Sequence, residues 1–243
     1  MKTVAIIQAR MGSTRLPGKI LQNLTGIPML TRVVNRVKRA TTVDEVVVAT
    51  TVEPADSAIE ELVKDSGWKY YRGSQDDVLD RYYHAAKQSE ADVIVRITSD
   101  CPLIDPGVLD RVVREFQNHN PEYAYVSNIN PTRHFPRGLD VEVFSLANLE
   151  LAWNEDTNPA QREHVTPYFY RNPDRFRIFC VTADADHSAH RWTVDTPEDL
   201  ALIQRIYDHF GHDHFDWKEV LSLCEAHPDW SELNREIAQK AVA

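Results

Sequence analysis

Three cations stand in one short loop near the start of the chain. The segment IIQARMGSTRLPGKIL at 6–21 places Arg10, Arg15 and Lys19 among small residues, directly after an apolar run that predicts a strand. Backbone N–H groups at small residues can approach phosphate oxygens, and arginine and lysine neutralise their charge. The loop therefore predicts a site for a phosphorylated ligand. The alternative is a basic surface loop between a strand and a helix.

The glycine spacing in this loop excludes two other phosphate-binding motifs. Five residues separate Gly12 from Gly18, whereas a Walker A loop has four. Ile20 stands where that loop needs a metal-binding hydroxyl. The G-x-G-x-x-G spacing of a dinucleotide-binding loop is also missing.

A carboxylate follows another apolar run. Asp100, in TSDCPLID, comes directly after DVIVRI at 92–97, which predicts a strand. Ligands of open α/β sheets bind beyond the carboxyl ends of strands, so Asp100 is placed to hold Mg²⁺ against phosphates. The alternative is a cap for the turn at Cys101. Asp105 is expected to cap the helix that follows.

The charge balance argues against a nucleic-acid or anionic-membrane partner. The 27 Lys and Arg stand against 37 Asp and Glu, giving a net charge of −10. Residues 1–40 nevertheless contain eight basic groups and no acidic ones. Half of these cations are predicted to form the solvated face of an amphipathic helix, which leaves the loop cations to meet a small anion. The four helix cations are Arg32, Arg36, Lys38 and Arg39.

The sequence favours a cytoplasmic protein without membrane insertion, because its start lacks a long apolar stretch. The three cysteines are odd in number and far apart, which predicts reduced thiols and neither a disulfide nor a zinc site. His209, His212 and His214 are interpreted as ordinary residues near a helix end, because no cysteine or acidic spacing of a closed metal site accompanies them.

Apolar runs typical of strands alternate with helical patterns through the first 128 residues, which predicts βαβ units. Nearly continuous apolar runs favour a mostly parallel sheet with helices on both faces. Beyond residue 128 the alternation fails. Expected strands lie at 3–8, 45–50, 69–72, 92–97, 123–128, 139–144 and 175–181. Expected helices lie at 28–39, 54–66, 76–89, 106–118, 145–155, 160–170 and 216–241, and another is expected to start at Thr196–Pro197.

Six ordered motifs give the sequence a family resemblance. They are QARMGSTRLPGK, DDVLDRYY (76–83), RITSDCPLIDP (96–106), FPRGLDVEVF (135–144), REHVTPY (162–168) and RWTVDTPEDL (191–200). Together they resemble the spore coat polysaccharide biosynthesis protein F family, which belongs to the cytidylyltransferases with the CMP-KDO and CMP-sialic acid synthetases. The resemblance implies a three-layer, Rossmann-like nucleotidyltransferase fold of the glycosyltransferase A type. It implies a domain at 1–210, with 211–243 as a helical appendage packed on it.

The resemblance also implies the nucleotide and metal sites. Arg15 and Lys19 would make the main contacts to the β- and γ-phosphates of CTP. The segment RGSQDDV at 72–78 would read cytosine, unless its acids are only first-turn helix residues. Asp195 would be the second acid at Mg²⁺ beside Asp100. The implied nucleotide-binding residues are Arg10, Gly12, Ser13, Thr14, Arg15, Lys19, Arg72, Ser74 and Asp77.

The acceptor side is less determined. Asp140 and Glu142, two residues apart in GLDVEVF, are expected on one face of a strand. Glu163 and His164 have an alternative as polar residues of a surface helix. A mixture of cations and carboxylates suits an anionic acceptor, and a nonulosonate, another sugar acid, a phosphonate and a polyol phosphate all stay open. The implied acceptor residues are Arg137, Asp140, Glu142, Glu163, His164 and Arg191.

The resulting hypothesis is a CTP-dependent cytidylyltransferase of cell-surface polysaccharide synthesis, working as a homodimer that the stretch 128–144 could support. It would transfer CMP to the acceptor and release pyrophosphate. One alternative is a non-catalytic nucleotide- or sugar-binding assembly module, which the paired acids and cations disfavour. The other is a glycosyltransferase on a related fold, which the triphosphate-type loop disfavours.

Overall fold

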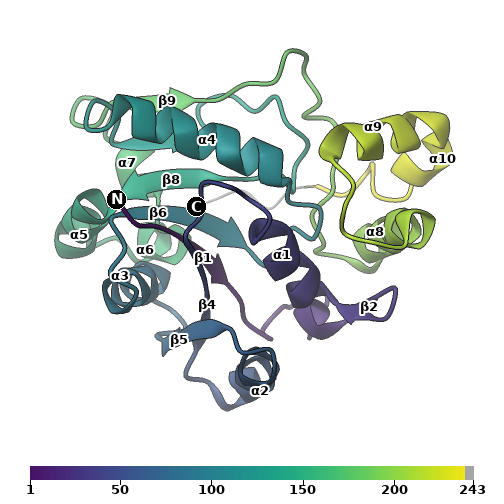
Figure 1. The fold of residues 1–243 in the computed structure, drawn as a ribbon, viewed down its shortest axis with the longest axis horizontal. Coiled ribbons are helices and arrows are strands. Elements are labelled where there is room, and N and C mark those ends of the chain that lie inside the picture. The colour runs from purple at the N-terminus through teal and green to yellow at the C-terminus, as the bar shows by residue number, and fades with distance from the viewer. Residues whose placement is uncertain (239–243) are drawn as a thin grey trace.

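A mixed sheet covered by helices on both faces forms the body of the protein (Figure 1). The computed structural model describes residues 1–238, and within them the sheet has seven strands. One strand, β8 (Glu142–Ser145), runs antiparallel to both of its neighbours, and all other neighbouring strands are parallel to each other. This confirms the expected α/β fold with a mostly parallel sheet. In spatial order the strands are β5 (Lys69–Gly73), β4 (Glu45–Thr51), β1 (Thr3–Gln8), β6 (Val93–Thr98), β8 (Glu142–Ser145), β7 (Tyr125–Ser127) and β9 (Ile178–Cys180).

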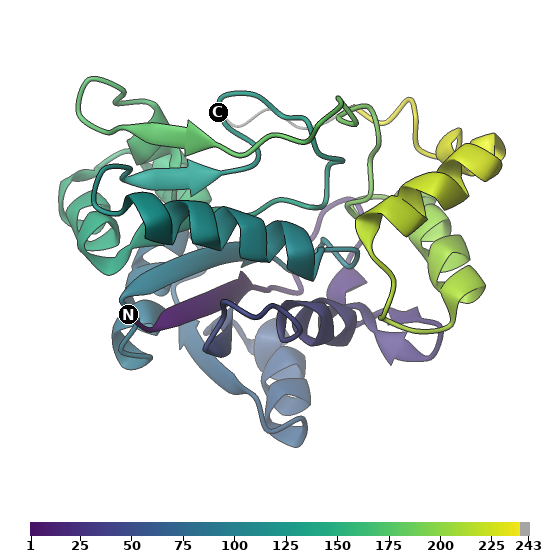
Figure 2. The same ribbon diagram turned by 45° about the horizontal axis from the view of Figure 1, so that its top comes forward.

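Strand alternation divides the apolar core into two layers. Ala5 and Ile7 of β1 face one layer, Val4 and Ile6 face the other, and all four are fully buried. Helices α1, α2 and α4 cover the first face, and α3, α5 and α7 cover the second. Figure 2 shows α4 along its face of the sheet. The bounds are α1 (Met29–Val37), α2 (Ser57–Asp65), α3 (Val78–Gln88), α4 (Pro106–His119), α5 (Leu146–Glu155) and α7 (Pro167–Tyr170).

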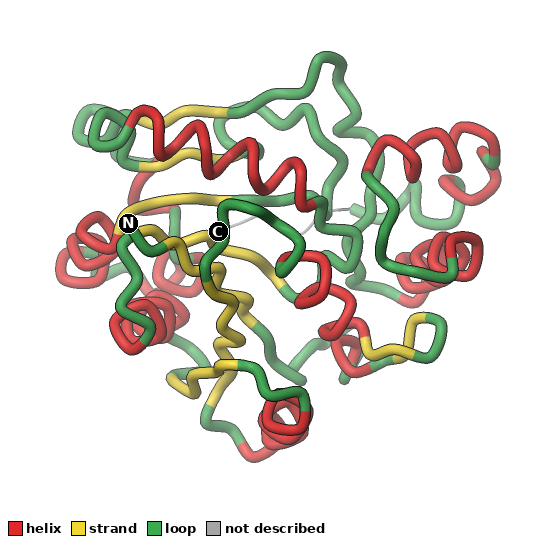
Figure 3. Tube along the Cα trace, in the orientation of Figure 1, coloured by secondary structure: helices red, strands yellow, loops and turns green. Residues whose placement is uncertain are grey.

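Strand β1 lies where the strand order reverses. The chain runs outward from β1 to β4 and β5, and then crosses back to β6 on the other side of β1. Ligands of open α/β sheets bind at such a switch point, beyond the carboxyl ends of the strands. The loops that follow β1 and β6 therefore meet where a ligand is expected. Figure 3 shows long loops, in green, filling the region between the sheet and the C-terminal helices.

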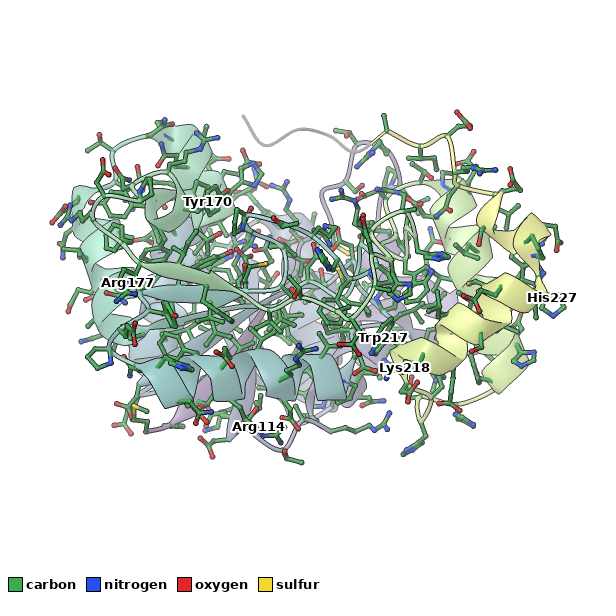
Figure 4. All side chains as sticks on the ribbon, turned by 90° about the horizontal axis from the view of Figure 1, so that it is seen from above. Arg114, Tyr170, Arg177, Trp217, Lys218 and His227 are labelled. Atoms are coloured by element: carbon green, nitrogen blue, oxygen red, sulfur yellow. The ribbon has the colours of Figure 1, made fainter. Side chains whose placement is uncertain are left out.

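The C-terminal helices stand beside the edge toward which β1 and β6 point (Figure 2). Asp105 joins them to the start of α4. Its Oδ1 accepts the N–H of Val108 at 2.9 Å, which confirms the predicted cap of α4, and its Oδ2 accepts the N–H of Trp217 at 2.9 Å. Figure 4 shows Trp217 and Lys218 beside that end of α4. No helix among the described residues is long and apolar enough to cross a membrane. The C-terminal helices are α8 (Pro197–Phe210), α9 (Trp217–Ala226) and α10 (Pro228–Ser231).

Two predicted helices are wrong as single elements. The predicted helix at 160–170 is two helices, α6 (Pro159–His164) and α7, because Val165 has a φ of +70° and the N–H of Thr166 turns back to the carbonyl of His164 at 2.8 Å. The predicted helix at 216–241 stops at Ala226, and Pro228, which has no N–H to donate, begins α10. Residues 239–241 of that prediction lie outside the described part. The other short elements are η1 (Lys19–Leu21), β2 (Asn23–Leu24), β3 (Ile27–Pro28) and η2 (Pro54–Asp56).

The prediction that Arg32 and Arg36 lie on a solvated helix face is wrong. Their exposed fractions are 2% and 0%. Nε of Arg36 donates to the carbonyl of Ile104 at 2.7 Å, and Nη1 of Arg32 pairs with Oδ2 of Asp213 at 3.1 Å. Arginine can be buried when acceptors satisfy its donors. Here Arg32 also donates to the nearby carbonyl of Leu24 at 2.9 Å, whereas Ile104 and Asp213 come from distant parts of the chain. The two cations of this helix that are exposed, as predicted, are Lys38 and Arg39.

Candidate active site

A cavity of about 320 Å³ opens at the carboxyl ends of β1 and β6. Cavities of about 480 and 620 Å³ lie beside the C-terminal helices, but the predicted chemistry gathers in the smaller one. Its walls carry four cationic and three carboxylate side chains, and this charge density suits a phosphorylated ligand. Of the residues proposed from the sequence, those lining it are Arg10, Gly12, Ser13, Thr14, Arg15, Lys19, Asp100, Glu163, His164 and Asp195.

The loop after β1 is shaped by a buried acid that the sequence analysis missed. Oδ1 of Asp56, a residue 2% exposed, accepts the N–H of Met11 at 2.7 Å. The loop closes where the N–H of Gly18 bonds the carbonyl of Met11 at 3.2 Å, with Gly18 at a φ of +68° that favours glycine. A Cβ at Gly12 would meet no atom within 4 Å, so the backbone there faces open space. The loop can therefore present N–H groups to a ligand.

Lys19 joins the two predicted metal acids. Its Nζ lies 2.9 Å from Oδ1 of Asp195, 3.2 Å from Oδ2 of Asp100 and 2.6 Å from the carbonyl of Val194. Burial alone would lower the pKa of Lys19, but the two carboxylates outweigh burial and raise it, so the ammonium stays charged. These three acceptors use all its N–H groups. A phosphate contact by Lys19 therefore requires one of them to be exchanged.

Asp195 is surrounded by cations. Its Oδ2 lies 3.0 Å from Nη2 of Arg15 and 2.9 Å from Nη2 of Arg191. Burial raises the pKa of Asp195, but Lys19 and Arg15 outweigh this and lower it, so the carboxylate is ionised. The cap of α8 is the hydroxyl of Thr196, which accepts the N–H of the third helical residue at 3.3 Å. Asp195 is thus not the helix cap.

A backbone pairing brings Asp195 to Asp100, although the two are far apart in sequence. The N–H of Val194 donates to the carbonyl of Asp100 at 2.8 Å. Gly138 packs closely against the backbone of this segment. A Cβ at position 138 would lie 2.7 Å from the carbonyl carbon of Trp192, and Gly138 has a φ of +106°. The position therefore requires glycine.

The donor chemistry of Asp100 and Asp195 fits Mg²⁺, which binds one or two carboxylates and takes its other ligands from phosphates and water. No group of three or more His, Cys, Asp or Glu side chains is arranged for a metal within residues 1–238.

The three side chains expected to read cytosine do not line the cavity. Arg72 donates to the carbonyl of Thr51 at 2.8 Å and pairs with Glu60. Oγ of Ser74 accepts the N–H of Asp77 at 3.0 Å. Asp77 immediately precedes the first turn of α3, caps that helix, and also pairs with a cation of α6 at 2.8 Å.

The cavity wall in this region is formed by Val78 and Arg81, one helical turn apart on α3. Arg81 is 2% exposed and donates to the carbonyl of Ser74. Sequence reasoning missed Arg81, although the three-residue spacing from Val78 places both on one face of a helix. Gln8, at the end of β1, was missed as well.

The residues proposed for the acceptor are divided among three places. Glu163 and His164 line the cavity, and Oε1 of Glu163 lies 3.9 Å from Nη2 of Arg10. Arg137 and Arg191 pair through their backbones and line the neighbouring cavity of about 480 Å³.

The last two proposed acceptor residues are held by other protein groups. Asp140 forms a two-pronged pair with Arg133 at 2.5 and 2.9 Å. Glu142 is 2% exposed and pairs with Arg96. The expectation that Asp140 and Glu142 share a strand face is wrong, because β8 begins only at Glu142. The amide of Asn128 instead bonds the two backbone groups at Leu139 and Val141.

The fold and the charged cavity are consistent with a nucleotidyltransferase, and the comparisons establish this class. A family model described as cytidylyltransferase matches residues 4–228, so the chain belongs to that family. The chain is 33% identical to the spore coat polysaccharide biosynthesis protein SpsF of Bacillus subtilis (strain 168), over 92% of this chain and 94% of that protein. The family resemblance seen in the sequence is confirmed.

Solved structures support the same assignment. A cytidylyltransferase from Leptospira borgpetersenii serovar Hardjo-bovis (strain JB197) matches with a TM-score of 0.91 and 35% identity, covering 99% of this chain and all of that one. A CMP:2-keto-3-deoxy-manno-octonic acid synthetase complexed with CTP matches with a TM-score of 0.65 and 22% identity, covering 86% and 99%. The second likeness shows the shared fold.

Proposed function

We propose that this enzyme transfers CMP from CTP to a small anionic acceptor and releases pyrophosphate. The observation that carries the proposal is the meeting of Arg10, Arg15 and Lys19 with two acids at the switch point of the sheet. A triphosphate needs cations and backbone donors on one side and a means of holding Mg²⁺ on the other. The loop after β1 and the pair Asp100 and Asp195 supply these two halves.

The reaction is an in-line displacement in this proposal. An acceptor oxygen forms a bond to the α-phosphorus of CTP, the bond from that phosphorus to the bridging oxygen of the β-phosphate breaks, and pyrophosphate leaves. Arg10 and Arg15 stabilise the charge on the phosphates, and Asp100 and Asp195 would hold Mg²⁺, which supplies further charge neutralisation when bound. Cys101, near the site, is 3% exposed, so a cysteine-linked intermediate is not part of the proposal.

The acceptor is proposed to lie at the edge of the cavity formed by Glu163 and His164. Arg191 approaches the same cavity through its contact with Asp195 at 2.9 Å. Cations near the attacking group suit an anionic acceptor, and carboxylates suit its hydroxyl or amino groups. The similarity to the spore coat polysaccharide biosynthesis protein SpsF supports a role in polysaccharide biosynthesis. A homodimer and an appendage at 211–243 remain predictions.

A direct assay tests this function. The purified protein would be incubated with CTP, Mg²⁺ and one acceptor at a time, drawn from nonulosonates, other sugar acids, phosphonates and polyol phosphates, and pyrophosphate would be measured. Release that depends on both CTP and one of these acceptors is the expected result. Binding of CTP without turnover on any acceptor would favour a non-catalytic nucleotide-binding module instead.

The enzyme is expected to prefer CTP over UTP, ATP and GTP. The match to the cytidylyltransferase family favours cytosine as the base. Competition binding in the presence of Mg²⁺, with labelled CTP displaced by each nucleotide, measures the preference. ATP or GTP binding as tightly as CTP would contradict it.

Replacing Lys19 by alanine is expected to reduce turnover by about tenfold to a hundredfold, since a charge-assisted hydrogen bond contributes roughly 1.5–3 kcal/mol. Without the ammonium, Asp100 and Asp195 would also lose their shared cation. Turnover and thermal melting would be measured together, with Lys38→Ala, directly after α1, as the exposed control. A large fall in melting temperature with unchanged specific activity would indicate a purely structural role for Lys19.

A further inference from the structure

Asn234 lies near the end of the described chain and yet is 3% exposed. Its Nδ2 donates to the carbonyl of Arg191 at 2.9 Å and to Oδ1 of Asp199 at 2.8 Å. The residue lies beyond position 228, where the match to the family model ends. Both bonds go to the motif RWTVDTPEDL at 191–200, which also carries Asp195.

The first partner of Asn234, Asp199, orients the segment that carries Asp195. Asp199 is fully buried at the start of α8. Its Oδ1 accepts Nε of Arg191 at 2.9 Å, and its Oδ2 accepts Nη2 of Arg191 at 3.0 Å, which makes a two-pronged pair. Oδ2 also accepts the N–H of Asp195 at 2.9 Å. Asp199 thus fixes both the guanidinium of Arg191 and the backbone of Asp195.

Arg191 connects Asp199 to Asp195, which lines the cavity. Nη2 of Arg191, in addition to bonding Asp199, donates to Oδ2 of Asp195 at 2.9 Å. Asp195 in turn contacts Arg15 at 3.0 Å and Lys19 at 2.9 Å. A continuous series of bonds therefore runs from Asn234 through Asp199 and Arg191 to the carboxylate that faces the cavity.

We propose that Asn234 is a positioning residue for Asp195. It acts by holding Asp199 and the Arg191 carbonyl, so that the guanidinium keeps Asp195 in its orientation. The inference rests on the proposed function, because it takes Asp195 as part of the catalytic site.

The chemistry of the position favours asparagine. The amide supplies a neutral donor for a carboxylate that already accepts both prongs of Arg191. An aspartate at 234 would place a second negative charge against Asp199 and compete for Arg191. An alanine would leave the Arg191 carbonyl and Asp199 without this buried partner.

Kinetics of Asn234→Ala and Asn234→Asp test the proposal. A small displacement of a catalytic group costs up to about a hundredfold in rate, so Asn234→Ala is expected to lower kcat roughly tenfold, with the KM for CTP within about twofold, and Asn234→Asp to lower kcat further. The matched control is Asn154→Ala, because Asn154 is exposed on α5 and its side chain donates to the carbonyl of Glu150, within the same helix. The control should keep full activity. Full kcat in Asn234→Ala would overturn the proposal.

A double-mutant cycle separates positioning from a general loss of stability. In an Arg191→Lys background the path to Asp195 is already weakened, so Asn234→Ala should add less than about a twofold further loss in kcat. Thermal melting of each variant shows whether the protein is folded at the assay temperature. Losses that multiply independently would overturn the proposal.

A structural measurement keeps this inference distinct from the proposed function. If the wild-type protein fails to turn over CTP with any acceptor of the panel, the proposed function fails, whereas the positioning of Asp195 by Asn234 can still be tested. Crystal structures of wild type and Asn234→Ala would then be compared at Arg191 Nη2 and Asp195 Oδ2, which lie 2.9 Å apart here. Separation of these atoms in the variant supports positioning by Asn234, and retention of the contact overturns it.

Discussion

Asp100→Asn and Asp195→Asn are each expected to lower CTP turnover by about a hundredfold, or roughly 3 kcal/mol, while the protein stays folded. Asparagine keeps the size of the side chain and an oxygen that can accept from Lys19, but it removes the charge that would hold Mg²⁺. Both side chains are partly exposed, at 27% and 14%, which limits the effect on stability. Pyrophosphate release at increasing Mg²⁺ measures the loss.

The same assay on the double variant tests whether Asp100 and Asp195 act as one unit. Both contact Lys19 Nζ and both are proposed to serve one ion, so the double variant should be far less impaired than the product of the single losses. The exposed Asp174→Asn serves as the control for loss of a negative charge. Losses that multiply, with an unchanged Mg²⁺ requirement, would contradict a shared ion.

The position of the site could be predicted because its signals are local. Lys19 follows β1 in a loop with small residues, and Asp100 follows β6, so the pattern of strand, loop and charge already places both at one edge of a parallel sheet. Asp195 could be added only from the family resemblance, since its approach to Asp100 depends on a backbone pairing between residues 94 positions apart.

The failures of prediction have a common physical origin in contacts between distant segments. The spacing of apolar residues in α1 correctly indicated its buried stripe, but nothing local shows that Asp213 and the Ile104 carbonyl accept from Arg32 and Arg36. An arginine with distant acceptors is buried, whereas the helical pattern alone places it in solvent.

Other predictions failed because the local sequence is compatible with two roles or conformations of the same residue. A first-turn acid such as Asp77 can cap its helix or face a ligand, and the structure shows the cap. A β-branched residue at positive φ, as at Val165, is too rare for a local pattern to predict. The bonds of Asn234 to Arg191 and Asp199 likewise depend on where the C-terminal segment packs.

Glu142→Ala is expected to destabilise the protein by about 3–5 kcal/mol, because it leaves the guanidinium of Arg96 buried without its counter-charge. Burial opposes the charge of Arg96, but Glu142 outweighs burial and raises the pKa of Arg96, so the cation persists. Oε1 of Glu142 also accepts from the hydroxyls of Tyr125 at 2.7 Å and Thr166 at 2.5 Å. The substitution therefore removes the acceptor of three donors, and the bonds from Tyr125 and Thr166 are buried.

Urea unfolding of Glu142→Ala beside Glu163→Ala decides between a structural and an acceptor-binding role for Glu142. The Glu163 side chain is 51% exposed and lines the cavity, so its loss should leave the free energy of unfolding almost unchanged and raise the KM for the acceptor. Glu142→Ala should show the opposite pattern, with a large loss of stability and an unchanged acceptor KM in the folded enzyme at low temperature. If Glu142→Ala instead unfolds like wild type but binds the acceptor weakly, Glu142 belongs to the acceptor site as the family resemblance implied, and the Arg96 pair contributes little to the fold.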